Sequence, residues 1–245
     1  MAENIYIDLT EEIEDDLRSR YEQLSQDLTD VLSGVRDGAT EICEKTSYEP
    51  MVNLINDITE KFNDEIRNDY STRAFDEWCD GEGSFSAIVE NSYAGDAAAE
   101  TARNLEAAIR GIFDDFWSSQ PLGDTILVDT SRPIINSEDY VELKEVYMHA
   151  FDDITKIEEE CTSSIASEGD ENPTYNVILP AIQALVHPIT VFFEGLAQKI
   201  EEAQSQSDEL KSQQDQKNDE AVQTATTTTA SVEQIADALA MFANL

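Results

Sequence analysis

The sequence predicts an all-α protein, with antiparallel helical hairpins packed as an elongated helical bundle and two similar halves as an option. Apolar residues recur at spacings of three and four through most of the 245 residues, which is the period of an amphipathic helix. Pro50, the glycine-rich run at 79–84 and Pro121 fall in the breaks between these segments. Hydrophobic residues make up 40% of the chain, so a real core is expected and wholesale disorder is disfavoured.

Residues 1–120 are predicted to form an N-terminal helical region that starts with a hairpin. Asp8 and Thr10 are candidate N-caps of the first helix, and Gly34 and Gly38 weaken its end. The apolar stripe of this helix consists of Ile13, Leu17, Tyr21, Leu24, Leu28, Val31 and Val35. Pro50 suits the first turn of a second helix. The stripe of that helix consists of Met51, Leu54, Ile55, Ile58, Phe62, Ile66 and Tyr70.

A third helix is predicted before residue 120, with Ser92 as its candidate cap. Its apolar residues are Ala97, Ala98, Leu105, Ile109, Ile112, Phe113, Phe116 and Trp117. Residues 121–137 are predicted to be a connecting loop. Within it, residues 125–128 are expected to form either a short strand or an apolar plug over the bundle.

Residues 138–205 are predicted to form a second helical region, capped by Ser137 and followed by a turn at 168–173. The first stripe consists of Leu143, Tyr147, Ala150, Ile154, Ile157, Cys161 and Ile165. The second consists of Ile178, Ile182, Leu185, Ile189, Phe192, Phe193, Leu196 and Ile200. Pro188 is expected to kink the last helix. The apolar run at 178–193 is short and interrupted for a membrane span and indicates a buried core helix.

After residue 205 the chain becomes more polar than the segments before it. Residues 206–229 are rich in Gln, Ser and Asp and are predicted to be a polar linker or a helix extension. Four consecutive threonines at 226–229 favour an extended backbone, so a break is expected there. Residues 230–245 are predicted to form a short amphipathic helix, which either docks on a partner or folds back on the bundle.

The chain is strongly acidic, with 53 Asp and Glu against 15 Lys and Arg and a formal net charge of -38. Such a surface repels phosphates and anionic lipids, so direct binding to nucleic acid or a membrane is disfavoured. It favours a basic protein surface as partner. Bulk solubility, including adaptation to high salt, is the alternative explanation of the charge.

No catalytic, cofactor or metal site is predicted. The three cysteines lack a paired spacing, which disfavours a disulfide framework and a zinc site. The loop at 80–86 is similar to the middle of a calcium-binding EF-hand, but Trp78 and Val89 occupy ligand positions, so a glycine turn is expected. His149 shares a helix face with Glu145 without a di-metal motif, and His187 is expected to be a packed core residue.

Interaction surfaces are therefore the remaining candidates. Trp78 and Trp117 lie near predicted helix ends, where a large aromatic either seals the bundle or anchors a partner. The other candidate partner-binding residues are the apolar side of the last helix, Val232, Ile235, Leu239 and Phe242.

The paired long helices with Trp78 and Gly81 between them resemble the WXG100 and LXG helical proteins of type VII secretion. The run at 181–189 is similar to the segment before the last long helix of LXG-like domains. The resemblance implies a helical hairpin exported without a cleaved signal and paired with another small helical protein. The sequence departs from the family in its Trp-x-x-Gly turn and in lacking a Tyr followed four residues later by an acid.

Two functional predictions follow. The first is a non-catalytic acidic helical protein that acts through protein–protein interaction, as a type VII secretion substrate or partner. The alternative is an acidic inhibitor that mimics DNA and blocks a basic nucleic-acid-binding surface. The sequence leaves open whether the protein forms a homo-oligomer or a hetero-oligomer. Residues 1–10 lack a signal-peptide pattern, so a cytoplasmic location or secretion without a cleaved signal is expected.

Overall fold

The computed structural model describes residues 9–45, 48–79, 85–90, 95–127 and 138–243, and the side chains of residues 230–243 lie outside the description. Every regular element in these ranges is helical, which confirms the predicted all-α fold. The chain divides into two compact units, Met1–Ile200 and Glu201–Leu245. Each unit is described below by itself.

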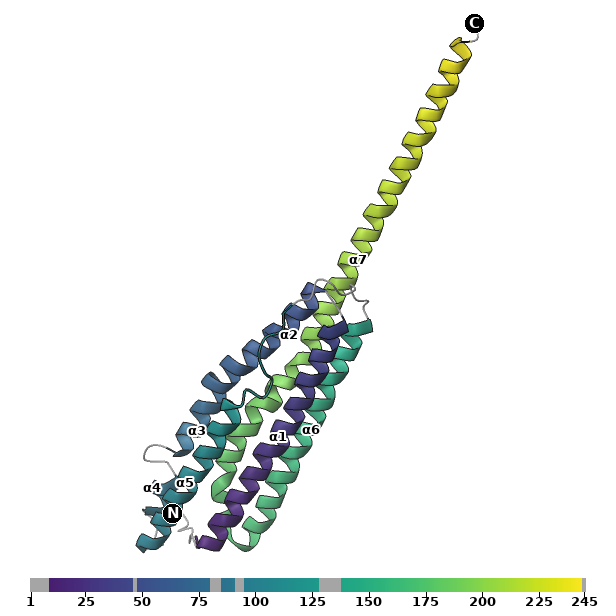
Figure 1. Cartoon of the computed structure of the whole chain (residues 1–245). Helices are drawn as coiled ribbons and strands as arrows, with labels where there is room; N and C mark the ends of the chain where they lie inside the picture. The colour runs from purple at the N-terminus through teal and green to yellow at the C-terminus, as the bar shows by residue number, and fades with distance from the viewer. Residues whose placement is uncertain (1–8, 46–47, 80–84, 91–94, 128–137, 244–245) are drawn as a thin grey trace. The chain divides into compact units, whose positions relative to one another are not determined.

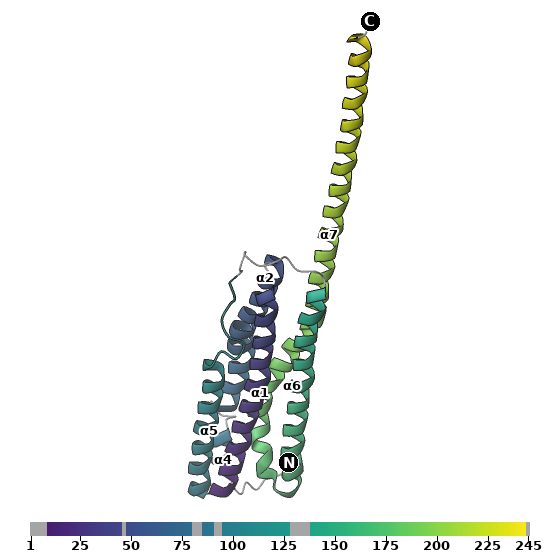
Figure 2. The same cartoon turned by 45° about the vertical axis from the view of Figure 1, so that its right-hand side comes forward.

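The first unit is a helical bundle whose successive long helices alternate in direction (Figure 1). A second view shows the same long helices lying side by side (Figure 2). The main elements are α1 (Glu11–Lys45), the combined helix α2–η1–α3 (Glu49–Cys79), α5 (Gly95–Ser118), α6 (Glu138–Glu171) and the start of α7 (Leu179–Ala243). Two short elements, α4 (Phe85–Glu90) and the 3-10 turn η2 (Pro173–Ile178), complete the unit. The helices of residues 1–120 and of residues 138–200 thus share one core.

Helix α1 begins where the sequence predicts. The Ile13 backbone N–H donates to Thr10 Oγ1 at 3.3 Å, so Thr10 is the N-cap. Gly34 and Gly38 lie inside the helix and do not end it. The core stripe contains Leu32 with no exposed surface, whereas the predicted Val31 is only half-buried.

The second long helix contains a ten-residue π-helical segment, η1 (Phe62–Ser71), between α2 (Glu49–Lys61) and α3 (Thr72–Cys79). In a π-helix the backbone bonds from residue i reach i+5, which adds one residue to the turn. The buried positions accordingly step from Ile66 to Ser71, and Tyr70 is 52% exposed. The prediction that Tyr70 belongs to the core stripe is wrong because regular α-helical spacing was assumed.

The segment after α5 crosses α2 without forming a strand over its described residues. The Asn56 side chain pairs with the Ile126 backbone, accepting from its N–H at 2.7 Å and donating to its carbonyl at 2.9 Å. Leu127 is 91% exposed, so the predicted apolar plug is wrong for this residue, whereas Leu122 is buried. Val128 and the predicted cap Ser137 lie outside the described residues.

Helix α6 runs to Glu171, so most of the turn predicted at 168–173 is helical. Asn172 makes the reversal and caps η2, because its side chain accepts a hydrogen bond from the Thr174 N–H. Gly169 is buried against Asn176, where an added Cβ would lie 2.3 Å from the Asn176 side chain. A side chain at position 169 would therefore require the exposed Asn176 side chain to move.

The first 22 residues of α7 lie in the core, as the sequence predicts. Ile182, Leu185 and Phe193 have no exposed surface. The helix continues through Pro188, which has no N–H for the carbonyl of Ala184 four residues earlier. Ser71 Oγ donates to that carbonyl at 2.9 Å. By length and composition alone, the stretch Pro173–Thr229 would suit a membrane span, but 44% of its most apolar window is buried inside the protein.

The second unit is the remainder of α7, from Glu201 to Ala243. The backbone is helical through the four threonines at 226–229, so the predicted break is wrong. Each of these threonines donates its hydroxyl to the carbonyl four residues earlier, at 2.8–2.9 Å, which is compatible with a helical backbone. Side chains 208–229 are all exposed. For residues 206–229 the structure therefore has the helix extension and not a flexible linker.

Candidate functional site

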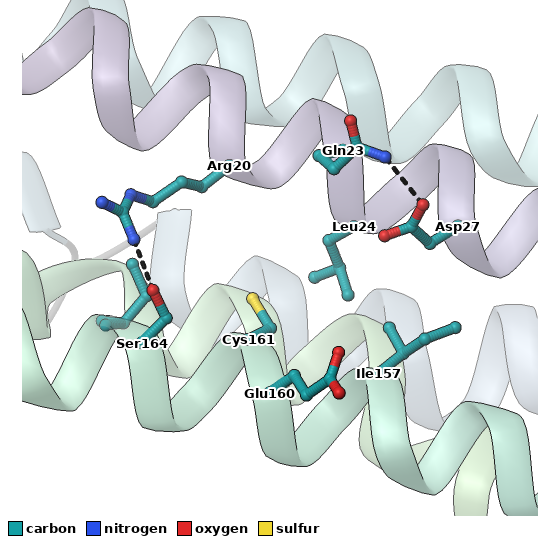
Figure 3. A pocket seen from close by; sticks show the side chains of 9 residues that line it. Arg20, Gln23, Leu24, Asp27, Ile157, Glu160, Cys161 and Ser164 are labelled. Carbon is teal, nitrogen blue, oxygen red and sulfur yellow. Dashed lines mark hydrogen bonds between the residues drawn. The ribbon is translucent and has the colours of Figure 1, made fainter.

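Two hollows follow the line of contact between the antiparallel helices α1 and α6. The first, of about 180 Å³, is lined by residues of both helices that face each other in Figure 3. Its lining residues are Arg20, Gln23, Leu24, Asp27, Ile157, Glu160, Cys161, Ser164 and Ile165. Arg20 and Ser164 come from opposite walls and share a hydrogen bond of 2.7 Å.

The second hollow, of about 450 Å³, continues the same line. Its lining residues are Asp30, Val31, Gly34, Val35, Val146, His149, Ala150 and Asp153. The lining residues advance along α1 from 20 to 35 while they retreat along α6 from 165 to 146. The two hollows thus lie along the same pair of helices, and they are called here together the α1–α6 groove, which is defined by their lining residues.

The groove has an apolar floor and acidic walls. Val31, Val146 and Ile157 are half-buried aliphatic side chains that face the hollows. Two carboxylates lie on each helix, and these are Asp27 and Asp30 on α1 with Asp153 and Glu160 on α6. Because an apolar strip between rows of one charge matches the faces of an oppositely charged amphipathic helix, this geometry suits a helical ligand.

The single arginine of the lining closes one end of the groove. Arg20 Nε lies 2.8 Å from Asp16 Oδ2, and its Nη2 lies 3.7 Å from Glu168 Oε1. Its guanidinium also lies 5.7 Å from the centre of the Tyr175 ring. These contacts occupy the positive charge, so the remainder of the groove is negative.

Cys161 lies in the groove but is a poor nucleophile. Burial is the main cause that raises the pKa of its thiol, and Arg20 lowers it only in part. A thiolate is the reactive form of cysteine, so the raised pKa disfavours covalent chemistry here. Cys161 therefore contributes a small apolar surface to the groove wall.

The two tryptophans lie in the core. Trp78 is 6% exposed, stacks on Phe85 at 5.9 Å and donates its indole N–H to the Val177 carbonyl at 3.0 Å. Trp117 is 3% exposed and packs against Phe62 at 5.4 Å. Neither ring faces outward, so the structure supports the sealing role for both residues and corrects the idea that they anchor a partner.

Of the two histidines, only His187 has surroundings that differ from those expected. His149 lines the second hollow, where it faces α1. His187 has a side chain that is 66% exposed, so the prediction of a packed core histidine is wrong. Its Nδ1 lies 3.9 Å from Glu158 Oε1, and Thr190 Oγ1 donates to the other oxygen of Glu158 at 2.8 Å. Among the described residues, no three His, Cys, Asp or Glu side chains gather closely enough to hold a metal.

The remaining candidates fall outside the description. The backbone around Val232, Ile235, Leu239 and Phe242 is helical, but these side chains are not described. The EF-hand-like residues 80–84 also lie outside the described residues. The partner-binding role of the four C-terminal side chains and the glycine turn at 80–84 therefore stay predictions.

The groove itself was not predicted, although its residues were visible in the sequence. Val31, Ile157 and Cys161 were assigned to core stripes, yet all three are only half-buried. Leu32 beside Val31 could have indicated that the core stripe passes next to Val31. Comparison with protein-family models, with curated proteins and with solved structures finds no match to this chain, so the groove is interpreted from its own geometry.

Proposed function

We propose that this protein is a non-catalytic, acidic binding protein that takes a basic amphipathic helix into the α1–α6 groove. The observation that carries the proposal is the pairing of an apolar floor with carboxylates on both walls. A helix with aliphatic residues on one face and Lys or Arg at its edges would complement both features at once.

The overall charge supports this choice of partner. With a net charge of -38, the protein attracts basic molecules over several ångströms before contact. The groove carboxylates would then form ion pairs at the edge of a bound helix, where screening by salt is strong. Binding should therefore be fast and should weaken as the salt concentration rises. The contacts with the apolar floor should persist at high salt, because salt does not screen them.

The first experiment measures binding of a labelled amphipathic peptide of Leu, Ala and Lys to the full chain by fluorescence anisotropy. The test variant carries Asp27→Asn, Asp30→Asn, Asp153→Asn and Glu160→Gln. The control variant removes the same charge from exposed residues elsewhere, with Glu100→Gln, Asp114→Asn, Asp115→Asn and Glu194→Gln. We expect the test variant to lose at least about tenfold in affinity, or about 1.4 kcal/mol, and the control to lose little.

Equal losses in the two variants would mean that the peptide responds only to net charge and would refute a groove-specific function. A peptide of the same composition in scrambled order, which forms no apolar face, provides a second control. Tight binding of the scrambled peptide would also contradict recognition by the groove.

The alternative proposal, an acidic inhibitor, also depends on the negative charge of the protein, but its ligand is a different one. It requires rows of carboxylates that match DNA phosphates and a basic globular surface as target. It is supported by the distribution of acids over the whole chain. A basic DNA-binding protein added as competitor separates the two, since it would displace the peptide only if both use the groove.

The type VII secretion proposal concerns the identity of the partner. It is supported by the all-α fold, while the Trp-x-x-Gly sequence at 78–81 departs from the Trp-x-Gly turn of that family. Co-expression with candidate helical partners, followed by analysis of the culture medium, tests it. Failure to find the protein outside the cell in any such pair would contradict that assignment without affecting the groove proposal.

A further inference from the structure

We infer that the hollow around Gly34 is an anchor pocket that admits one bulky apolar side chain of the bound basic helix. The inference rests on the proposed function and makes it more specific. It predicts a ligand with a large aliphatic or aromatic residue flanked, three or four positions away, by Lys or Arg.

Gly34 is an exposed residue of α1 that lines this pocket and brings no side chain into it. A Cβ added at Gly34 would meet no heavy atom within 4 Å. One turn farther along α1 the situation reverses, because a Cβ on Gly38 would lie 3.1 Å from both methyl carbons of Val146. The hollow is therefore unobstructed at Gly34, and α1 and α6 come close together at Gly38.

The walls of the pocket are apolar on both helices. Val31 and Val35 stand one turn apart on α1, and Val146 and Ala150 stand one turn apart on α6. Together with Asp30, Gly34, His149 and Asp153 they line a space of about 450 Å³ that opens to the surface. Interfaces commonly concentrate their affinity in one large side chain placed in such a pocket, and this hollow has the matching character.

The rim of the pocket is negative on both sides. Asp30 and Asp153 line the same hollow as the four apolar wall residues. On a ligand helix, residues three and four positions from the anchor lie on the same face, and these would reach the two carboxylates. Charge complementarity thus selects a basic helix and disfavours a second copy of this acidic chain as occupant.

Glycine alone does not identify the pocket. Gly111 on α5 and Gly195 on α7 also have no heavy atom within 4 Å of an added Cβ. The difference is location, since only Gly34 among these three lines one of the hollows described above. Gly111 therefore provides a matched control in which a new side chain enters solvent.

The experiment measures binding of a basic amphipathic peptide with a single central Trp, and of the same peptide with that Trp replaced by Ala. The proteins are the wild type, the series Gly34→Ala, Gly34→Leu and Gly34→Phe, and the controls Gly111→Ala, Gly111→Leu and Gly111→Phe. We expect wild type to bind the Trp peptide at least about tenfold more tightly than the Ala peptide. We also expect the Gly34 series to lose this preference progressively, while the Gly111 series keeps it.

The Ala variants guard the test against misfolding, because Ala is favoured over Gly in the interior of a helix. Circular dichroism of every variant checks that the bundle is intact. Unchanged Trp preference in a folded Gly34→Phe protein would overturn the anchor pocket and leave the groove proposal standing. If the wild type binds neither peptide, the proposed function itself fails.

Discussion

Two stretches of α7 have the same secondary structure but are stabilised in different ways. From Leu179 to Ile200 the helix lies in the core, and many of its side chains have no exposed surface. From Asp208 to Thr229 every side chain is exposed. The first stretch is held by tertiary contacts, whereas the second depends on its own backbone bonds and on local side-chain interactions.

The packed stretch is also fixed through its carbonyl groups. Tyr21 Oη donates to the Ala181 carbonyl at 3.4 Å, and Ser71 Oγ donates to the Ala184 carbonyl at 2.9 Å. The exposed stretch bonds only to itself among its described contacts, for example from Gln213 to Glu209. A continuous helix can therefore contain one part that is stabilised by packing against other helices and another part that is stabilised only by interactions within the helix itself.

The largest expected effect is the loss of a core ring from the packed stretch. Phe193 has no exposed surface and contacts the rings of Phe62, Tyr147 and Phe192. We expect Phe193→Ala to lower the free energy of unfolding by about 3–5 kcal/mol, measured by urea denaturation. Val191→Ala, two residues away and 51% exposed, is the control and should cost under about 0.5 kcal/mol. Similar costs would contradict the packing described for α7.

Alkaline pH should weaken the same core. Burial raises the pKa of Tyr21 and of Tyr147 above the ordinary value of about 10. The folded state therefore keeps both phenol protons at a pH where the unfolded state releases them, so stability falls as pH rises above about 10. The slope is at most about 1.4 kcal/mol per pH unit for each tyrosine. Denaturation of Tyr21→Phe and Tyr147→Phe between pH 9 and 11 should show a shallower dependence; an unchanged slope would contradict this assignment.

A smaller effect is expected at the proline of the packed stretch. Ser71→Ala leaves the buried Ala184 carbonyl without its donor and should cost about 1–3 kcal/mol. Pro188→Ala supplies a new backbone N–H for the same carbonyl, so Ser71→Ala should cost less in that background. A double-mutant cycle by chemical denaturation measures the difference. Additive costs would show that Ser71 does not compensate for Pro188.

The smallest effect is expected in the exposed stretch. Thr228 is exposed, and its hydroxyl donates to the Thr224 carbonyl at 2.8 Å. We expect Thr228→Ala to favour the local helix by up to about 0.7 kcal/mol and Thr228→Gly to weaken it. Hydrogen exchange of the backbone amides near residue 228 should respond in opposite directions. The unfolding midpoint of the bundle should not move, and a shift would mean that this stretch is packed.

Much of the fold could be predicted because periodic apolar residues report which side of a helix is buried. Leu17, Tyr21, Leu24 and Leu28 are core residues, as their spacing indicates. The errors arise where other features override that spacing, since Val31 follows it and is still only half-buried. Tyr70 is displaced by the π-helical segment, and the four threonines at 226–229 stay helical although their intrinsic preference is for extended backbone.

The groove could not be predicted because it depends on which edge of a helix faces a neighbour. Val31 and Leu32 are adjacent and both aliphatic, yet Leu32 is fully buried and Val31 lines a hollow. Gly34 could be identified only as a weak point of α1. Its place in the lining of a hollow depends on the position of α6, which no local pattern in α1 encodes.

The π-helical segment has a consequence for length changes in this chain. Each residue added to or removed from a helix rotates everything beyond it by roughly 100° about the axis. The segment Phe62–Ser71 holds one such extra residue, and Phe75 and Trp78 come after it. A one-residue deletion within this segment would return the turn to α-helical bonding and keep the Trp78 indole near Val177, so it should be tolerated better than a deletion in a regular helix of the bundle.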